Sequence, residues 1–169
     1  MHLATERLLL APLGRQHVDE LAAVYADGEV ASYIGGASLD TEATAEQVAH
    51  FASIWTTLGY GQSAVFLRAS GEFIGRVGLQ PWPAWNEVEI GWVIARHAQR
   101  QGYAHEAASA WLRAAFVELA LDRLIAVIHP DNLASRSLAE KLGLTVHRSD
   151  VTPNGVRVLI YECLAPSDA

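Results

Sequence analysis

A strand that leads directly into an amphipathic helix constrains this fold more than any other feature of the sequence. In residues 87–94 apolar side chains alternate with the others, and this period of two predicts a strand with Glu87 and Glu89 on one face. Apolar residues then recur at helical spacing: Ala108, Trp111, Leu112, Ala115, Phe116 and Leu119. Only a short polar stretch that contains Gly102 separates the two elements. The chain must therefore combine sheet and helix.

The remaining segments extend this mixed α/β pattern over the whole sequence. We expect further strands at residues 6–13, 63–68, 73–79, 124–128, 144–148 and 156–162. We expect further helices near residues 18–25, from Asp40 or Thr41 to near Gly59, and in a segment that ends at Gly143. No repeat or linker divides the 169 residues, so the sequence predicts one domain over residues 1–164 and a short tail over 165–169.

Composition argues against several classes of function. The formal net charge is −7 and there is no basic run, so nucleic acid is not an expected partner. Cys163 is the single cysteine, which leaves no intramolecular disulfide and no thiolate cluster. The seven histidines lack metal-ligand spacing, so no metal is expected. No segment has the length of a membrane span and the first residues lack a basic leader, so we expect a cytoplasmic protein without a membrane partner.

Residues 99–107 have the features of a phosphate-binding turn. They join the predicted strand to the start of the predicted helix, where unpaired N–H groups and the helix dipole favour an anion. Gly102 and Ala104 would let a ligand approach the backbone closely. The pattern predicts a pyrophosphate site, although the same residues also suit an ordinary turn at the start of a helix.

The arrangement Gln99-x-x-Gly102-x-Ala104 resembles the pyrophosphate loop of the GCN5-related N-acetyltransferases, the GNAT family. Further segments are similar to the branch typified by the ribosomal-protein N-terminal acetyltransferases: residues 5–10, 73–75, 77–79, 89–92, 130–135 and 140–143. They follow the order and spacing of that branch over nearly the whole chain. The resemblance implies the GNAT fold, a mostly antiparallel seven-stranded sheet with two splayed parallel strands, flanked by about four helices.

The resemblance also implies acetyl-CoA as the cosubstrate, held between the parallel strands at residues 87–94 and 124–128. Its pantetheine would pair with Trp92, Val93 and Ile94. Its pyrophosphate would lie on the turn formed by Gln99, Arg100, Gln101, Gly102, Tyr103 and Ala104. Asn132 and Ser135 would approach the pantetheine or the sulfur from the other side.

The implied reaction is direct attack on the thioester by a primary amine, either a peptide N-terminus or a small molecule. An alkylammonium group is almost fully protonated near neutral pH, so a base must take its proton. We assign this role to Glu89 first and to Glu87 second, the alternative being that both are solvated charges on an exposed sheet face. A backbone amide of Trp92 or Val93 would stabilise the developing oxyanion.

Two positions depart from the pattern of the family. Many relatives have a tyrosine, placed to protonate the CoA sulfur, where this chain has Ala139. Ser135 is the expected substitute and Tyr161 a weaker one, although Ser135 also suits the capping region of its helix. Arg100 stands where many relatives have glycine, and its charge would either hold a phosphate or point into water.

The acceptor pocket is the least defined part of the site. The loop that contains Trp82 and Trp85 is expected to line this pocket together with residues 33–36, the alternative being that its indoles pack over a hydrophobic edge. The identity of the acceptor amine stays open, because a family likeness does not fix a substrate. A homodimer is a reasonable expectation for a domain of this kind.

Three other hypotheses about the function remain open. The first is a non-catalytic acyl-CoA-binding or regulatory module on the same fold, suggested by Ala139. The second is a hydrolase built on the carboxylate pair of Glu87 and Glu89. The third is a nucleotide-binding protein, although the turn lacks the Gly-Lys-Ser/Thr ending of a P-loop.

Overall fold

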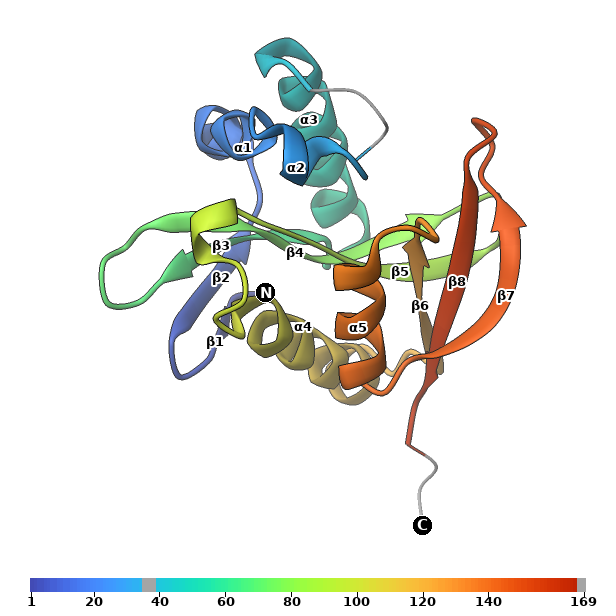
Figure 1. The fold of residues 1–169 in the computed structure, drawn as a ribbon. Coiled ribbons are helices and arrows are strands. Elements are labelled where there is room, and N and C mark those ends of the chain that lie inside the picture. The colour runs from blue at the N-terminus through green and yellow to red at the C-terminus, as the bar shows by residue number, and fades with distance from the viewer. Residues whose placement is uncertain (35–38, 167–169) are drawn as a thin grey trace.

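The computed structural model describes residues 1–34 and 39–166, and its centre is an eight-stranded mixed sheet (Figure 1). The strands are β1 (Leu3–Ala4), β2 (Leu8–Pro12), β3 (Gln62–Leu67), β4 (Phe73–Trp82), β5 (Glu87–Ile94), β6 (Arg123–Ile128), β7 (Thr145–Val151) and β8 (Arg157–Leu164). Their order across the sheet is β1-β2-β3-β4-β5-β6-β8-β7. Neighbours are antiparallel, apart from the parallel pair of β5 and β6.

Helices connect and cover these strands. They are α1 (Val18–Tyr25), α2 (Gly28–Ala31), α3 (Thr41–Leu58), α4 (Tyr103–Arg113) and α5 (Leu133–Lys141). Short 3₁₀ turns lie at Arg15–His17 and Arg96–Ala98, and a π-helical stretch over Ala114–Glu118 continues α4. None of these helices is long and apolar enough to cross a membrane.

The expected α/β class is confirmed, and two details of the expected fold are corrected. The sheet has eight strands instead of seven because Leu3–Ala4 pairs with β2 through a tight turn, in which the N–H of Thr5 donates to the carbonyl of Leu8 at 3.0 Å. The sequence reading also missed the single turn of α2, which is capped by Asp27 Oδ1 accepting from the N–H of Glu29 at 3.0 Å. The predicted strand over residues 87–94 coincides with β5.

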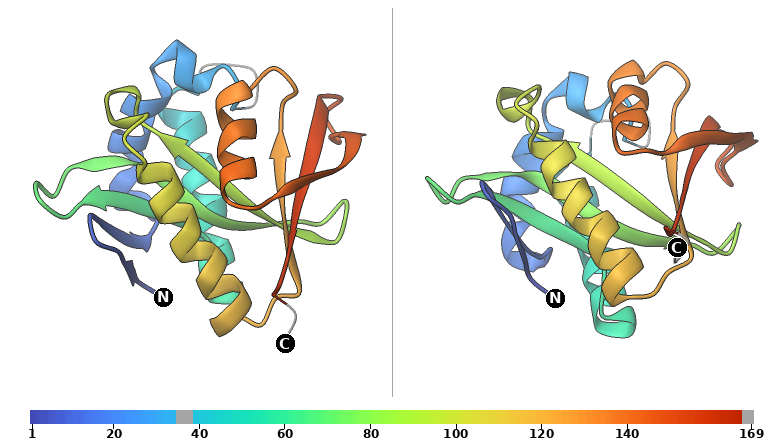
Figure 2. Two further views of the ribbon diagram at one scale, coloured as in Figure 1. Left: turned by 60° about the horizontal axis from the view of Figure 1, so that its bottom comes forward. Right: turned by 90° about the horizontal axis from the view of Figure 1, so that it is seen from below.

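The sheet separates two helical layers, which Figures 1 and 2 show from different sides. Helices α1 and α3 cover one face, whereas α4 crosses the other face and α5 lies beside it, next to β6. The alternation along β5 divides its side chains between these layers. Ile90 and Ile94 join the core under α4, and Val93 joins the core under α1 and α3. Glu89 therefore lies on the face of α1 and α3.

The parallel strands β5 and β6 are joined by a single register pair, Glu89 opposite Ile125. After this pair the two strands diverge toward their carboxyl ends, as Figure 2 shows. Strand β6 continues beside β8 along its whole length, and β5 continues beside β4. The later residues of β5 thus have a strand partner on one edge and none on the other, which opens the middle of the sheet.

Strand β4 bends at Gly75, whose φ of 140° lies in the region that favours glycine. A β-carbon at this position would overlap the carbonyl oxygen of Val93 on β5. The close approach of β4 and β5 beside the divergence therefore depends on this glycine. Gly28, at the start of α2, offers a contrast, because a β-carbon there would meet nothing within 4 Å.

We expect Gly75→Ala to lower the free energy of unfolding by at least about 2 kcal/mol, through backbone strain and the overlap with Val93. Gly28→Ala, the same change at an open helical position, should stay within about 1 kcal/mol of the wild type. Urea denaturation followed by tryptophan fluorescence measures both values. Equal stability of the two variants would show that β4 accommodates the methyl group without cost.

Candidate functional site

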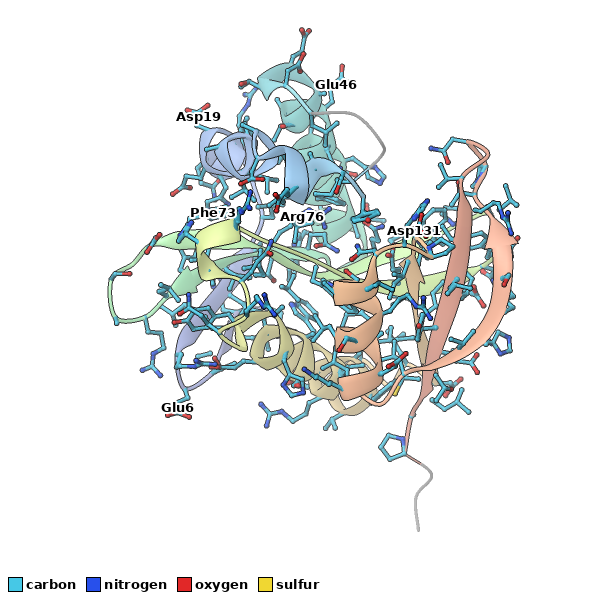
Figure 3. All side chains as sticks on the ribbon, in the orientation of Figure 1. Glu6, Asp19, Glu46, Phe73, Arg76 and Asp131 are labelled. Atoms are coloured by element: carbon cyan, nitrogen blue, oxygen red, sulfur yellow. The ribbon has the colours of Figure 1, made fainter. Side chains whose placement is uncertain are left out.

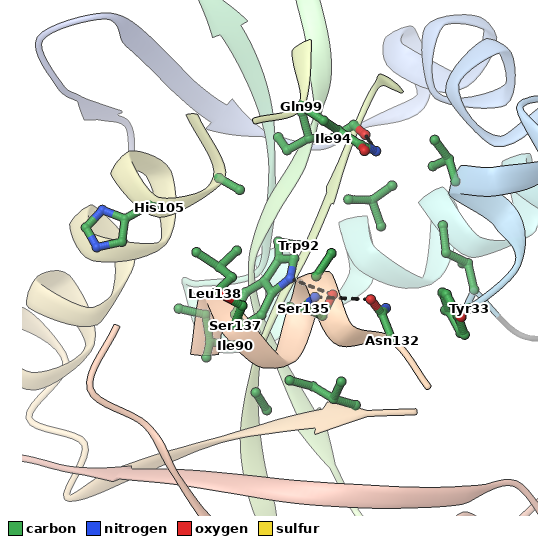
Figure 4. Close-up of a pocket in the computed structure, with 18 of the residues that line it drawn as sticks. Tyr33, Ile90, Trp92, Ile94, Gln99, His105, Asn132, Ser135, Ser137 and Leu138 are labelled. Carbon is green, nitrogen blue, oxygen red and sulfur yellow. Dashed lines mark hydrogen bonds between the residues drawn. The ribbon is translucent and has the colours of Figure 1, made fainter. Parts of the chain in front are cut away.

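A cavity of about 870 Å³ lies where β5 and β6 diverge. Side chains from both faces of the sheet line it. Those on the side of α1 and α3 include Arg76, Gln80 and Glu89, and those on the side of α4 and α5 include Trp92, Ile94 and Leu138. Figure 4 shows Trp92 and Leu138 at α5 and Ile94 farther along β5, beside Gln99. The cavity therefore connects the two faces of the sheet through the divergence.

Most of the residues selected from the sequence meet at this cavity. Its lining includes Glu89, Trp92, Val93, Ile94, Gln99, Arg100, Gly102, Tyr103, Ala104, Asn132 and Ser135. Glu87 and Gln101 are outside the lining, and the side-chain amide of Gln101 donates to the carbonyl of His97 at 3.0 Å. The part of the chain that the structure describes contains no group of three or more His, Cys, Asp or Glu arranged to hold a metal.

Glu89 is a buried acid on the cavity wall, with 8% of its surface exposed. Its Oε2 accepts hydrogen bonds from Trp82 Nε1 at 2.5 Å and from Gln80 Nε2 at 2.6 Å. Burial raises the pKa of this carboxyl above its usual value, while the two hydrogen bonds and the charge of Arg76 act in the opposite direction. A buried carboxyl with a raised pKa in a cavity has the properties of a proton acceptor for a bound ligand.

Glu87 lies on the same strand face but in a different environment. Its carboxylate pairs with Arg123 and with Arg148, the latter at 2.8 Å. Arg123 also pairs with Glu162 at 3.0 Å, and Arg148 with Asp150 at 3.1 Å. This ion cluster joins β5, β6, β7 and β8 outside the cavity. Its geometry suits a structural ion pair better than a base, and the burial of both glutamates excludes the alternative that they are solvated.

The turn before α4 exposes backbone N–H groups to the cavity. Gly102 precedes the helix with φ of 83°, and no side chain caps the first turn. The N–H groups of that turn therefore have no intrahelical partner, and their residues, Gly102, Tyr103 and Ala104, line the cavity. The side-chain amide of Gln99 donates to the carbonyl of Ile94 at 2.9 Å, which fixes the turn to the end of β5. Arg100 has φ of 60°, a conformation that favours glycine.

Ser135 and Trp92 meet across the opposite wall, as Figure 4 shows. Trp92 Nε1 donates to Ser135 Oγ at 3.2 Å. An indole N–H can only donate, so the serine hydroxyl is the acceptor and its own proton is available to another group. Asn132 caps α5, because its Oδ1 accepts from the N–H of Ser135 at 3.1 Å. The capping role considered for Ser135 is thus carried by the side chain of Asn132.

Two other positions bear on the general acid, Ala139, where many relatives have tyrosine, and Tyr161, and both lie away from the cavity. Ala139 is fully buried in the core and is not among the lining residues, so a side chain at this position faces away from the site. The Tyr161 hydroxyl accepts from Arg136 Nε at 3.1 Å and contacts Glu140 Oε1 at 3.4 Å. Ser135 is the member of this set that lines the cavity.

The tryptophans before β5 support Glu89 from outside the cavity. The rings of Trp82 and Trp85 stack with centroids 4.6 Å apart, and Arg148 lies 5.5 Å from the centre of the Trp85 ring. Neither tryptophan is among the lining residues, so the expectation that they wall the acceptor pocket is corrected. Trp82 instead holds the carboxyl of Glu89 through its indole N–H.

Tyr33 does line the cavity, as expected for part of the loop at residues 33–36. Its hydroxyl donates to the carbonyl of Asp131 at 3.2 Å, which links the end of the α2 segment to the turn before α5. Gly35 and Gly36 lie outside the described residues.

Sequence reasoning missed Arg76 and Gln80, which both line the cavity from β4. The available signal was the arginine itself, a charged residue in an otherwise apolar strand. It could not be interpreted alone because its contacts, Tyr25 and Gln62, come from distant parts of the chain.

Comparison with known proteins identifies the family. The family model described as "Acetyltransferase (GNAT) domain" matches residues 7–145. The uncharacterised protein YkkB of Bacillus subtilis is 40% identical over 51% of this chain and 52% of its own length. The uncharacterised N-acetyltransferase YnaD of the same organism is 30% identical over 85% of this chain and 82% of its own. The FsC-acetyl coenzyme A-N(2)-transacetylase of Aspergillus fumigatus is 32% identical over 91% of this chain and 71% of its own.

Solved structures agree with this assignment. The acetyltransferase from Agrobacterium tumefaciens superposes with a TM-score of 0.86 at 29% identity, over 96% of this chain and 94% of its own. RimL, a ribosomal L7/L12 α-N-protein acetyltransferase solved with coenzyme A, has a TM-score of 0.81 at 17% identity, over 99% and 100% of the two chains. The second likeness concerns the fold alone.

The two glutamates should respond differently to the same amide substitution. Burial raises the pKa of Glu89 in the folded state above its value in the unfolded state, which is about 4.3. The contribution of this group to the free energy of unfolding is therefore fully present below about pH 4.3 and is lost as the pH rises through the folded-state pKa. Glu89→Gln does not titrate. Its free energy of unfolding, relative to the wild type, should therefore increase with pH above about 4.3, as measured by urea denaturation at a series of pH values.

Glu87→Gln is the matched comparison. At pH 7 we expect it to lose about 2 kcal/mol, because Arg123 and Arg148 lose a charged partner. If the difference in the free energy of unfolding between Glu89→Gln and the wild type does not change with pH, this result would contradict a titrating buried carboxyl at Glu89. Unchanged stability of Glu87→Gln would contradict the structural role of the ion cluster.

Proposed function

The chain belongs to the GNAT acetyltransferase family, and from this premise we propose that it is an enzyme that transfers the acetyl group of acetyl-CoA to a primary amine. The observation that carries the proposal is the cavity at the divergence of β5 and β6. One side of it holds a buried carboxyl, and the other holds an uncapped helix start. A proton acceptor and an anion site are thus joined through the sheet, as amine acylation by a phosphate-bearing thioester requires.

Acetyl-CoA suits the wall on the side of α4 and α5. The backbone of Trp92, Val93 and Ile94 has no strand partner on the side of β6, so its polar groups would pair with the pantetheine. The N–H groups at the start of α4, from Gly102 onward, would hold the pyrophosphate. Arg100 lines the same wall and adds positive charge near these phosphates.

Glu89 is placed to act on the amine. The nitrogen must lose a proton to attack, and the carboxylate of Glu89 accepts it directly or through a water molecule. The N–C bond then forms at the thioester carbonyl while a backbone amide of Trp92 or Val93 stabilises the oxyanion. The buried position of Glu89 favours return of the carboxyl to its neutral form, which matches its role as proton acceptor.

Ser135 is placed to act on the leaving group. When the C–S bond breaks, the sulfur leaves as a thiolate that needs a proton. The Ser135 hydroxyl accepts from Trp92, which leaves its own proton free to donate toward the cavity. Ala139 does not argue for a non-catalytic module, because that position lies outside the cavity and its small side chain removes nothing from the site.

Acetyl-CoA binding can be measured by thermal unfolding with acetyl-CoA, CoA and ATP. At about a hundredfold over the dissociation constant, both CoA forms should stabilise the protein by about 2.7 kcal/mol, a rise of about 5–10 °C in Tm. ATP should give no comparable rise, because it has no pantetheine to pair with the backbone of Trp92, Val93 and Ile94. Absence of a shift with either CoA form would overturn the proposal.

Removal of the proton acceptor should separate chemistry from binding. Glu89→Gln should lower kcat for acetylation of a primary amine by about 10²–10⁴-fold and retain the thermal shift with acetyl-CoA. Glu46→Gln, the same change on the exposed surface of α3, is the control. Full activity of Glu89→Gln would exclude this residue as the base. Loss of activity in Glu87→Gln alone, with its fold intact, would reassign the role to Glu87.

A further inference from the structure

Arg76 is a buried cation on the cavity wall that the transfer chemistry does not use. It lies on β4 with 8% of its surface exposed, between the sheet and the helices on the face of α1 and α3 (Figure 3). Its Nε donates to the Tyr25 hydroxyl at 2.6 Å and its Nη1 to Gln62 Oε1 at 3.0 Å. The guanidinium carbon also lies 5.1 Å from the centre of the Phe51 ring. All three partners are neutral.

Within residues 1–34 and 39–166, no carboxylate pairs with this guanidinium, and its Nη2 forms no hydrogen bond. The acids on the cavity wall are Glu29 and Glu89. Glu29 pairs with Arg96 at 2.9 Å, and Glu89 is held by the neutral donors of Trp82 and Gln80. A buried charge is costly unless it is paired. The charge of Arg76 acts on Glu89 through space, but no described carboxylate contacts the guanidinium, whose Nη2 is thus available to the anionic group of a ligand.

The space between Arg76 and Glu89 lies above Gly91 and is bordered by the side-chain amide of Gln62. The two residues lie on the same sheet face, four register positions apart, which is about 13 Å along the strands before their side chains reach toward one another. Between them Gly78 pairs with Gly91, and Gly91 lines the cavity. Arg76, Gly91 and Glu89 all line the cavity, so a small molecule beside Gln62 can have one end at the cation and the other at the carboxyl.

We propose that the acceptor is an amino carboxylate, an amine that carries a carboxylate in the same molecule. The carboxylate would bind Arg76 and the amine would lie beside Glu89. This inference rests on the proposed acetyl transfer and adds the class of acceptor to it. The planar guanidinium suits a carboxylate because both are flat and can form two parallel hydrogen bonds. The charges of such a ligand run opposite to those of the cavity.

The transfer step balances with this acceptor. The ammonium nitrogen loses two protons: one passes to Glu89 and frees the lone pair that forms the N–C bond, and the other leaves as the C–S bond of the thioester breaks, which balances the proton that the departing CoA sulfur takes up. The product is an N-acetyl carboxylate, which keeps the group that Arg76 binds and loses the charge that faces Glu89. An amine without an anionic group leaves Arg76 unpaired and is therefore the poorer acceptor.

The test compares acceptors that differ only in the negative charge. We would assay L-alanine, L-methionine and 4-aminobutanoate, each beside its own primary amide, with acetyl-CoA and wild-type protein. At least one acid should exceed its amide in kcat/KM by about tenfold to a hundredfold, mainly through KM. Neutral amides acetylated as well as the acids, or no acid acetylated, would overturn the inference. The thermal shift with acetyl-CoA judges the proposed function separately.

Substitution of Arg76 separates a ligand role from a structural one. Arg76→Met keeps the apolar stem and removes the charge, so the ratio of kcat/KM for the acid over the amide should fall toward one, whereas any effect through the pKa of Glu89 changes both acceptors alike. Arg76→Lys, which keeps a charge, should retain part of the preference. Arg113→Met, the same change at an exposed position at the end of α4, should keep the wild-type ratio.

A purely structural role gives a different pattern. It would lower kcat/KM for acid and amide together in Arg76→Met and leave their ratio unchanged, and this result would overturn the inference. The acetyl-CoA thermal shift of each variant reports whether the fold and the cosubstrate site persist. If Arg76→Met does not fold, the ratio measured with Arg76→Lys decides, because equal ratios in this variant and the wild type would also contradict recognition by the two-pronged guanidinium.

Discussion

The rest of the structure depends on the single backbone pair that joins β5 to β6, Glu89 opposite Ile125. The other edge of each strand pairs with an antiparallel neighbour, so the divergence leaves one strand-free edge on β5 and one on β6 in the interior of the molecule. Buried backbone groups need partners, and a bound ligand can supply them where the Glu89 side chain, which bonds the backbone of Val127, does not. The turn after β5 and the start of α5 after β6 both follow the diverging carboxyl ends, where open α/β sheets bind their ligands.

Because side chains alternate along β5, polar groups of this strand lie on both sides of the opening. Trp92 points to the layer of α4 and α5, where it holds Ser135. Glu89 points to the layer of α1 and α3, where the buried cation Arg76 also lies. A strand with period two thus separates the two sets of cavity-lining side chains by the thickness of the sheet, and the divergence is where they meet. The division of roles follows from the pleat of one strand.

Patterns within one segment were predicted well from the sequence, and features made by distant segments were not. The bounds of β5 and the shared face of Glu87 and Glu89 follow from local alternation. The difference between the two acids does not, because Arg123 and Arg148 surround one while Trp82 and Gln80 hold the other. Arg76 was missed for the same reason. The direction of Ala139 depends on how α5 is rotated against the sheet, which periodicity in a short helix does not determine.

The ion cluster around Glu87 connects the two halves of the sheet. Strands β1 to β5 and strands β6 to β8 share one backbone pair and the side-chain bonds of Glu87, which lie at the end of β5 opposite to the divergence. The two halves of the sheet are thus joined at one end of β5 and separated at the other. A molecule held between the open ends touches both halves and adds contacts where the backbone provides none. We therefore expect a ligand in this cavity to stabilise the folded sheet.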